Sequence, residues 1–447
     1  MGLRHPVSPY RLYLILESGV NFMLGIAYAT IMVYWVISGR LNPLQLVLLG
    51  TVLELSYFLL QLPTGALADL VSRRLCVLAG VFIEGVALIM QGLSPSFANL
   101  LAGQAVVGLG AALSDGALEA WIADELPVDR REGGEGQSEA GYTDHSLTGI
   151  YLRGTQLGLV ATMAGSLLSG AIALAGLKDP LLVAGPLLCL LAVAMAFVMP
   201  ERRFRSRATP GARLGVAGIT RRALGQLADQ TRMTRRAIVA VPGLVLLFGM
   251  TLFVGLWSEG FDRLWGAFLL RDIKFPRLGG LHPALWFSFI ACAVALLALA
   301  STEVARRRTA RLGPDSVVGA LLGVTLAIGA AAVVMATSNS FVVAVVAYLG
   351  VSILRPVFVP LVSGWMVGRI EPSVRATALS ARDMFDSAGQ IVGGPGIGLV
   401  GNLISIRAAL LAAAAALAPA AVCIMTASRK IRALPAARAA SAEEAQV

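Results

Sequence analysis

Acidic side chains recur at helical spacing inside long apolar stretches of this chain, and they are the residues that could carry a charge across a membrane. Asp115 and Glu119 are four residues apart, so a continuous helix would place them on one face. Two carboxylates this close resist being charged together, which favours the binding of a proton. We therefore expect the pair to carry a proton. Arg153 is an alternative partner that would make the pairing structural.

Acids and arginines also occur together at the same spacing. The members of these two groups are Glu259, Asp262 and Arg263, and Arg382, Asp383 and Asp386. In both groups an acid and an arginine are four residues apart, so each group is either a self-neutralising structural pair or a functional site. Glu17 and Asn21, also four apart, add a third polar face, and Trp257 and Trp265 are candidate aromatic neighbours.

The elements that position these residues follow from composition. The chain is 57% hydrophobic and 14% charged, and its mean hydropathy is +0.77. Soluble domains carry about 25% charged residues. We therefore expect an all-α membrane protein, because lipid offers no partner to unpaired backbone groups.

Twelve apolar runs are long enough to cross a bilayer as helices. They lie near 11–37, 43–68, 75–93, 97–124, 148–176, 180–199, 242–270, 282–304, 317–336, 340–368, 376–401 and 405–427. The four cysteines fall in or beside these runs without metal or disulfide spacing. No metal or other cofactor is expected.

Basic residues set the expected orientation. They cluster between alternate runs, which places both termini in the cytoplasm and the chain in the plasma (inner) membrane. This clustering also argues against a nucleic-acid partner for a chain of net charge +10. The arginine-rich composition suggests a bacterial origin.

The predicted organisation is two six-helix bundles. The N-terminal bundle covers 1–199, a basic linker covers 200–241, the C-terminal bundle covers 242–428 and a tail covers 429–447. The linker holds ten arginines and is either an interfacial helix on anionic lipid or a solvated connection.

The two bundles resemble each other, so we expect pseudo-symmetry. Asp69 precedes Arg73 and Arg74 between the second and third runs, and Glu303 precedes Arg307 at the same spacing in the second bundle. A parallel repeat of six helices is typical of transporters.

The stretch GALADLVSRR, residues 65–74, resembles the loop signature of the major facilitator superfamily. Gly65, Asp69, Arg73 and Arg74 match the signature, whereas Ser72 stands where the family usually has glycine. The resemblance extends over the whole chain and implies a twelve-helix transporter that acts as a monomer. It also implies that a central cavity is lined by helices one, four, seven and ten. The residues that would then face the substrate are Glu17, Asn21, Asp115, Glu119, Glu259 and Asp262.

The motif itself predicts a latch. Small residues around Gly65 would let a neighbouring helix approach closely. Asp69 would face the N-terminus of helix eleven, where the helix dipole favours a carboxylate, and Arg73 would pair with Asp124. Such a latch would hold the bundles together on the inner side and favour an outward-open state. The alternative is that the two arginines only mark a cytoplasmic loop.

The predicted function is secondary active transport, with proton-coupled efflux of an amphipathic small molecule by antiport as the leading interpretation. The glycine and proline pattern around Pro395 resembles that of superfamily exporters, although it lies here on helix eleven. Exporters often carry an arginine on helix four where this chain has Gln104, so coupling would use other residues. The alternatives are a proton-coupled importer of a polar solute and a membrane sensor. We expect no enzyme, because no Walker, GxSxG or HExxH motif is present.

Overall fold

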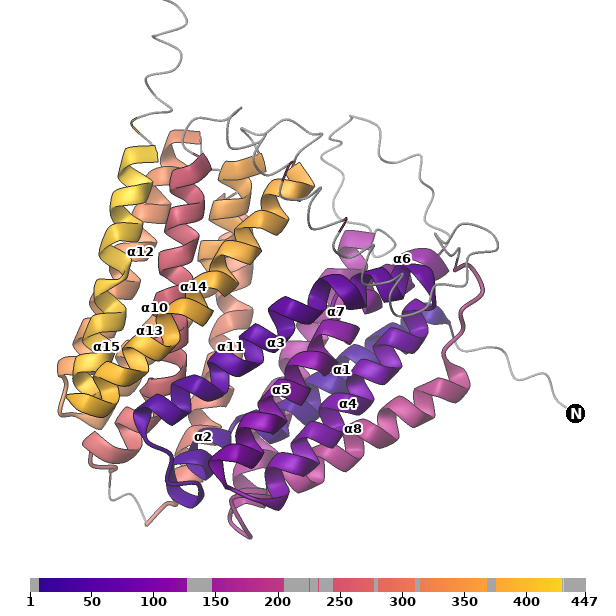
Figure 1. Ribbon diagram of the computed structural model, residues 1–447, viewed down its shortest axis with the longest axis horizontal. Coiled ribbons are helices and arrows are strands. Elements are labelled where there is room, and N and C mark those ends of the chain that lie inside the picture. The colour runs from indigo at the N-terminus through magenta and orange to yellow at the C-terminus, as the bar shows by residue number, and fades with distance from the viewer. Residues whose placement is uncertain are drawn as a thin grey trace, which may run out of the picture. The chain divides into compact units, whose positions relative to one another are not determined.

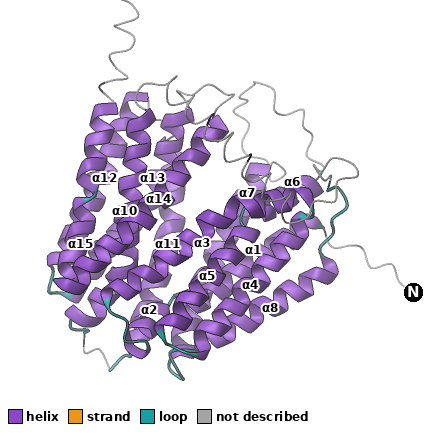
Figure 2. Ribbon diagram, in the orientation of Figure 1, coloured by secondary structure: helices purple, strands orange, loops and turns teal. Residues whose placement is uncertain are grey.

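A computed structural model describes residues 8–126, 147–204, 225, 232, 244–276, 280–309, 314–367, 375–427 and 429, with the backbone alone at 302–309, 314–315, 367 and 376–377. Among these residues every regular element is helical (Figure 2). Most of the basic linker and of the C-terminal tail lies outside the described residues.

Within the described residues, the first six spanning segments contain nine helices, because two of the segments are interrupted. The helices are α1 (Pro9–Tyr28), α2 (Ile31–Val33), the π-helix η1 (Tyr34–Ser38), α3 (Pro43–Leu70), α4 (Arg73–Leu93), α5 (Phe97–Ser114), α6 (Ala117–Glu125), α7 (Leu147–Ala173) and α8 (Asp179–Val198) (Figure 1). The first span thus comprises α1, α2 and η1, and the fourth comprises α5 and α6.

The second six spanning segments follow the same pattern. They are α10 (Leu244–Asp272), α11 (Pro283–Thr309), α12 (Pro314–Thr337), α13 (Phe341–Val367), α14 (Arg375–Leu403), and the segment Ile406–Ala427, which begins with α15 (Ile406–Ala415). Eleven of the described helical segments are long and apolar enough to cross a membrane, and α14 is long enough but carries Arg382, Asp383 and Asp386. The predicted all-α multi-pass architecture is confirmed, with the helix ends within a few residues of expectation.

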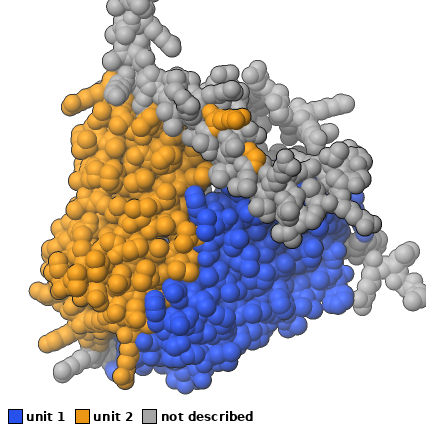
Figure 3. Space-filling model, viewed as in Figure 1, with its two compact units in different colours: residues 1–39, 56–223, 280–296 blue, residues 40–55, 224–279, 297–447 orange. Residues whose placement is uncertain are grey.

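Contacts between residues divide the chain into two compact units (Figure 3). Unit 1 contains residues 1–39, 56–223 and 280–296, and unit 2 contains residues 40–55, 224–279 and 297–447. The first part of α3 therefore packs with unit 2, and the first part of α11 packs with unit 1. The sequence predicts two six-helix bundles that are divided at the linker 200–241. The compact units do not follow that division, because each contains part of a helix from the other half of the chain. The predicted bundles therefore stay a prediction.

Unit 1 is organised by α1 against α7 and by α4 against α5 and α8. The backbones of α1 and α7 touch, since a Cβ at Gly165 would overlap the carbonyl oxygen of Phe22. Near the start of α4, Cys76 packs in an apolar cluster with Ala117, Trp121 and Ile122 of α6.

Unit 2 repeats this arrangement with α10 against α14 and α12 against α13. A Cβ at Gly389 of α14 would overlap the carbonyl oxygen of Leu252 of α10. Close contact between backbones is a common way for helices to associate in lipid, where apolar burial offers no drive. Both helix pairs occupy equivalent places in the two bundles, as the sequence repeat predicts.

Candidate functional site

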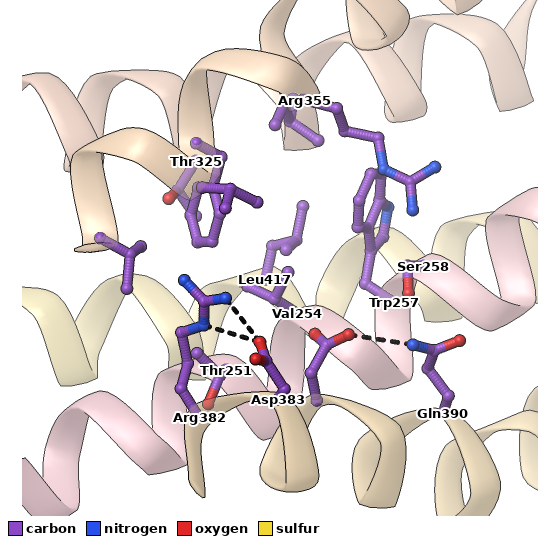
Figure 4. Close-up of a pocket in the computed structure, with 15 residues that line it drawn as sticks. Thr251, Val254, Trp257, Ser258, Thr325, Arg355, Arg382, Asp383, Gln390 and Leu417 are labelled. Carbon is purple, nitrogen blue, oxygen red and sulfur yellow. Dashed lines mark hydrogen bonds and ion pairs between the residues drawn. The ribbon is translucent and has the colours of Figure 1, made fainter. Parts of the chain in front are cut away.

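A cavity of about 200 Å³ lies within unit 2 (Figure 4). Its walls come from α10, α12, α13 and α14, with Leu417 from the last span. Trp257 and Phe358 supply aromatic surface, and Thr251 and Thr325 supply hydroxyl groups. A mostly apolar cavity with a few polar groups is the usual form of a small-molecule site.

Arg382 lies on one wall of this cavity, and its guanidinium is already occupied. It donates to Asp383 Oδ1 over 2.9 Å through Nε, and to Ser363 Oγ over 2.7 Å through Nη1. The alternative in which Arg382 and Asp386 form a self-neutralising pair is therefore wrong, because the guanidinium binds Asp383 and Ser363. Figure 4 shows the two bonds from Arg382 to Asp383 at the cavity edge.

Asp386 also lines the cavity, but a neutral group binds its carboxylate. The side-chain amide of Gln390 donates to Asp386 Oδ2 over 2.9 Å. Within the part of the chain that the structure describes, no guanidinium or ammonium group forms an ion pair with Asp386. The cavity therefore contains one acid whose charge is not neutralised by direct contact.

The opposite wall contains Arg355 of α13 and Trp257 of α10. Arg355 Nη1 binds Asp262 Oδ1 over 2.7 Å, and the guanidinium carbon lies 5.2 Å from the centre of a Trp257 ring. Trp265 stacks on Tyr348 with a centroid separation of 3.9 Å. Asp262, expected to lie beside Glu259 and Arg263, is thus held by a different helix.

The pairing of Glu259 with Arg263 is present, with 3.2 Å between Oε1 and Nε. Glu259 is 2% exposed, so its carboxylate depends on this partner. The pair lies directly against α3, since a Cβ at Gly50 would overlap both Glu259 Oε1 and Arg263 Nε. Glu54, one turn further along α3, makes no hydrogen bond or ion pair among the described residues. The Glu54 carboxylate nevertheless interacts electrostatically with Glu259 and Arg263.

The charges of unit 2 do not balance in this region. Among the described residues, the charged groups that act on one another beside the cavity are five carboxylates and three guanidinium groups, those of Glu54, Glu259, Asp262, Asp383 and Asp386 and of Arg263, Arg355 and Arg382. Arg382 and Asp383 neutralise each other. Unbalanced charge is costly within a bilayer, so the surplus carboxylates are suited to bind protons or a cation.

The acids of the fourth span do not share a helix face. α5 ends at Ser114, Asp115 is extended with ψ of 132°, and Gly116 adopts a left-handed conformation with φ of 70° before α6 begins. The expected i, i+4 arrangement of Asp115 and Glu119 is therefore wrong, because the helix is interrupted between them. Asp115 instead accepts a hydrogen bond from the hydroxyl of Tyr57 on α3.

Three other expected residues lie in unit 1. Asn21 donates through its side chain to Glu17 Oε1 over 3.2 Å, so this pair faces one side of α1 as expected. The charges of Glu119 and Asp115 act on Glu17, so the three acids are electrostatic neighbours. Arg153 lies on the exposed side of α7, and its pairing with the acids stays a prediction.

The residues of the proposed latch come together at the start of α4. Arg73 Nη1 lies 2.5 Å from Asp124 Oδ2 and donates to the Ala120 carbonyl over 2.9 Å. Arg73 Nη2 lies 3.2 Å from Asp69 Oδ1. The ion pair between Arg73 and Asp124 is thus present as expected. The close approach of a neighbouring helix expected at Gly65 is not present, because a Cβ at this position would meet no atom within 4 Å.

Arg74 and Ser72 connect the latch to the end of α8. Glu201 accepts a hydrogen bond from the Arg74 backbone N–H over 3.0 Å and from the Ser72 hydroxyl over 2.6 Å. Ser72 Oγ also accepts from the Leu75 backbone N–H and so caps α4. The serine that departs from the family signature therefore has a structural role. The expected contact of Asp69 with helix eleven stays a prediction.

The second copy of the motif is described only in part. Glu303 and Arg307 lie within α11, but their side chains are outside the described residues. Glu54 and Arg355 are candidates by sequence only as charges that interrupt apolar runs, and the structure brings both beside the cavity. Tyr57 was missed, because tyrosine is common in spanning helices and gives no signal.

Solved structures share this fold at low sequence identity. The nucleoside transporter NupG aligns with a TM-score of 0.70 at 12% identity, covering 94% of this chain and 98% of its own. A bacterial homolog of the human lysosomal transporter Spinster, in an inward-facing and unoccupied conformation, aligns with a TM-score of 0.67 at 18% identity, covering 95% and 98%. A POT family transporter in complex with a thioalcohol-conjugated peptide aligns with a TM-score of 0.69 at 12% identity, covering 94% and 96%.

No curated protein sequence matches the chain significantly. The sequence model of the Major Facilitator Superfamily matches residues 16–312, which is more than half of the chain. This match includes the latch motif and the whole of unit 1 that the structure describes from residue 16 onward. The chain therefore belongs to the Major Facilitator Superfamily, a family of membrane transporters.

Proposed function

We propose that this protein is a proton-coupled secondary transporter that exports an amphipathic organic cation by alternating access. The observation that carries the proposal is Asp386, an acid that lines the cavity and that, among the residues the structure describes, is bound by the neutral amide of Gln390 and by no charged group. A proton or a positively charged solute would each neutralise this carboxylate. Two ligands that compete for one carboxylate are exchanged for each other, which is antiport.

The cavity also has surface for the apolar part of such a solute. Trp257 and Phe358 provide aromatic faces, and Thr251 and Ser258 also line the cavity. Aromatic faces attract cations as well as apolar groups, at about 0.5–2 kcal/mol per contact. The export direction is further favoured by the glycine and proline pattern of α14 around Pro395.

The remaining parts of the proposal concern the setting of the protein. We place it in the plasma membrane as a monomer, with both termini in the cytoplasm. The basic linker and tail support this orientation, because arginine-rich segments stay on the cytoplasmic side. Glu17, Asn21, Asp115 and Glu119 are proposed as the contribution of unit 1 to the transport path.

A second candidate function is proton-coupled uptake of a polar solute. Its support is the polar part of the cavity lining, where Arg355, Arg382 and Gln390 could bind an anionic or hydrogen-bonding group. Proteins titled as nucleoside and peptide transporters have the same fold. Arg355 and Arg382 are, however, already paired with carboxylates, which makes them weaker anion ligands.

The test is efflux of a preloaded fluorescent organic cation from cells that lack their main pumps, with and without an uncoupler. Wild type is compared with Asp386→Asn, with the double variant Asp115→Asn/Glu119→Gln, and with the control Asp179→Asn at the start of α8. Uncoupler-sensitive efflux that is lost in Asp386→Asn and kept in the control supports the proposal. Efflux that Asp386→Asn leaves intact contradicts the role of this residue, and absence of efflux in wild type favours the uptake of polar solutes.

A further inference from the structure

The fourth span is broken at a defined point within the membrane-spanning region. α5 ends at Ser114, α6 starts at Ala117, and the two residues between them leave the helical conformation. Gly116 has φ of 70°, in the left-handed region that residues with a Cβ enter at a cost. The direction of α6 therefore depends on the backbone at this single position.

Two hydrogen bonds from side chains of α3 stabilise the break in the fourth span. In a continuous helix the Ala112 carbonyl would accept from the N–H of residue 116. Here the Thr64 hydroxyl donates to that carbonyl over 2.6 Å instead, which is shorter than its distance of 2.8 Å to the competing Leu60 carbonyl of its own helix. Tyr57 donates to the carboxylate of Asp115. Ala112 is 5% exposed, so without the Thr64 hydroxyl its carbonyl would be buried without a partner for as long as the break persists.

The helix beyond the break carries the latch. Asp124 of α6 pairs with Arg73, and the Trp121 indole donates to the Pro200 carbonyl over 2.7 Å. Glu125 accepts from the backbone N–H groups of Arg202 and Arg203 over 2.7 Å and 2.9 Å. A change of direction at Gly116 would therefore act on the latch and on the segment that leaves α8.

We propose that the Asp115–Gly116 break is a hinge of the fourth span and that Thr64 is a positioning residue that keeps the latch closed. With the Thr64 bond in place, α6 lies on α4 and Arg73 reaches Asp124. When the fourth span straightens, residue 116 replaces Thr64 as partner of the Ala112 carbonyl, and α6 turns away from α4. The inference rests on the proposed transport function only in treating this latch as a gate.

Gly116 allows the backbone effect to be separated from side-chain contact. A Cβ at this position would meet no atom within 4 Å, so Gly116→Ala adds strain without a clash. Asparagine enters the left-handed region more readily than alanine, so Gly116→Asn should restore the hinge. Gly323→Ala is the matched control, because Gly323 is a helical glycine of α12 whose Cβ would also meet nothing.

The chain contains its own reporter of the hinge. Cys76 is 2% exposed and belongs to the same buried apolar cluster as Ala117, Trp121 and Ile122 of α6. A movement of α6 away from α4 would open this cluster and make the thiol more accessible. The experiment therefore measures the alkylation rate of Cys76 in purified protein in which Cys189, Cys292 and Cys423 are replaced by serine.

We expect Thr64→Val and Gly116→Ala each to raise the Cys76 alkylation rate about tenfold, the factor that corresponds to about 1.4 kcal/mol. Thr64→Ser, Gly116→Asn and the control Gly323→Ala should remain within about twofold of wild type, since the first two keep the hydroxyl and the left-handed backbone. A parallel set that retains only Cys423 in unit 2 should show no change, because the movement is local.

Three results would overturn the inference. The first is an unchanged Cys76 rate in both Thr64→Val and Gly116→Ala. The second is an equal increase in Gly116→Asn and Gly116→Ala, and the third is an increase at Cys423. The second and third would each mean a general loosening of the protein instead of a hinge. Labelling needs no substrate, so this outcome is independent of whether the proposed transport of cations is correct.

Discussion

The ion pair between Arg73 and Asp124 gives the most quantitative prediction about gating. The two side chains are 15% and 29% exposed, and Nη1 and Oδ2 are 2.5 Å apart. A hydrogen bond between charged groups contributes about 1.5–3 kcal/mol, and a neutral one about 0.5–1.5 kcal/mol. Asp124→Asn should therefore weaken the closed latch by about 1–1.5 kcal/mol, and Asp124→Ala by about 2–3 kcal/mol.

These free energies correspond to roughly tenfold and roughly 30- to 150-fold shifts in the population of the open latch. The assay is the alkylation rate of Cys76 in a double-mutant cycle of Arg73→Ala and Asp124→Ala, with Asp179→Ala as a control at a distant acid. Because Arg73 also binds Asp69 and the Ala120 carbonyl, Arg73→Ala alone should have a larger effect than Asp124→Ala.

The cycle should give a coupling free energy of about 1–3 kcal/mol, which falls when salt is raised. If Arg73→Ala has the same effect with and without Asp124, the two residues act independently. That result would refute the latch even if each variant alone were impaired.

Three further predictions concern packing and capping. Gly50→Ala would force apart the Glu259–Arg263 pair and should abolish transport at normal expression. The assay is efflux, with Gly323→Ala as the control, and intact efflux in Gly50→Ala would contradict the packing described. Gly389→Ala should lower stability by about 1–3 kcal/mol in thermal denaturation, because its Cβ would overlap backbone of α10, and an unchanged melting temperature would refute that contact. Glu201→Ala removes the acceptor for Ser72 and Arg74 and should cost about 0.5–2 kcal/mol in the same assay, whereas Glu201→Gln should cost less.

The fold could be predicted from the sequence because the bilayer imposes a simple rule. Helices of about 20 apolar residues are required, and their boundaries are marked by arginines, glycines and prolines. The same simplicity made two local pairs predictable. Glu259 with Arg263 needs only a straight helix, and Arg73 with Asp124 needs only two helix ends at the same side of the membrane.

The parts that sequence reasoning missed depend on tertiary contacts. The interruption at Gly116 has no strong local signal, because a glycine inside an apolar run is usually helical. It is held by Thr64, which binds the carbonyl of Ala112 and lies 48 residues before Ala112 in the chain. Arg382 binds Asp383 and not Asp386, and its guanidinium also donates to Ser363 of another helix. Spacing along one helix cannot reveal such partners.

The central claim is that a proton and an organic cation exchange at Asp386. The most direct measurement uses proteoliposomes that contain a trapped pH indicator, to which a fluorescent organic cation is added in the presence of a pH gradient. Wild type should move protons and the organic cation in opposite directions. Asp386→Asn should show neither the coupled proton flux nor the coupled cation flux. The control Asp179→Asn should behave as wild type. Movement of the cation with no movement of protons in wild type, or full coupling in Asp386→Asn, would contradict the account.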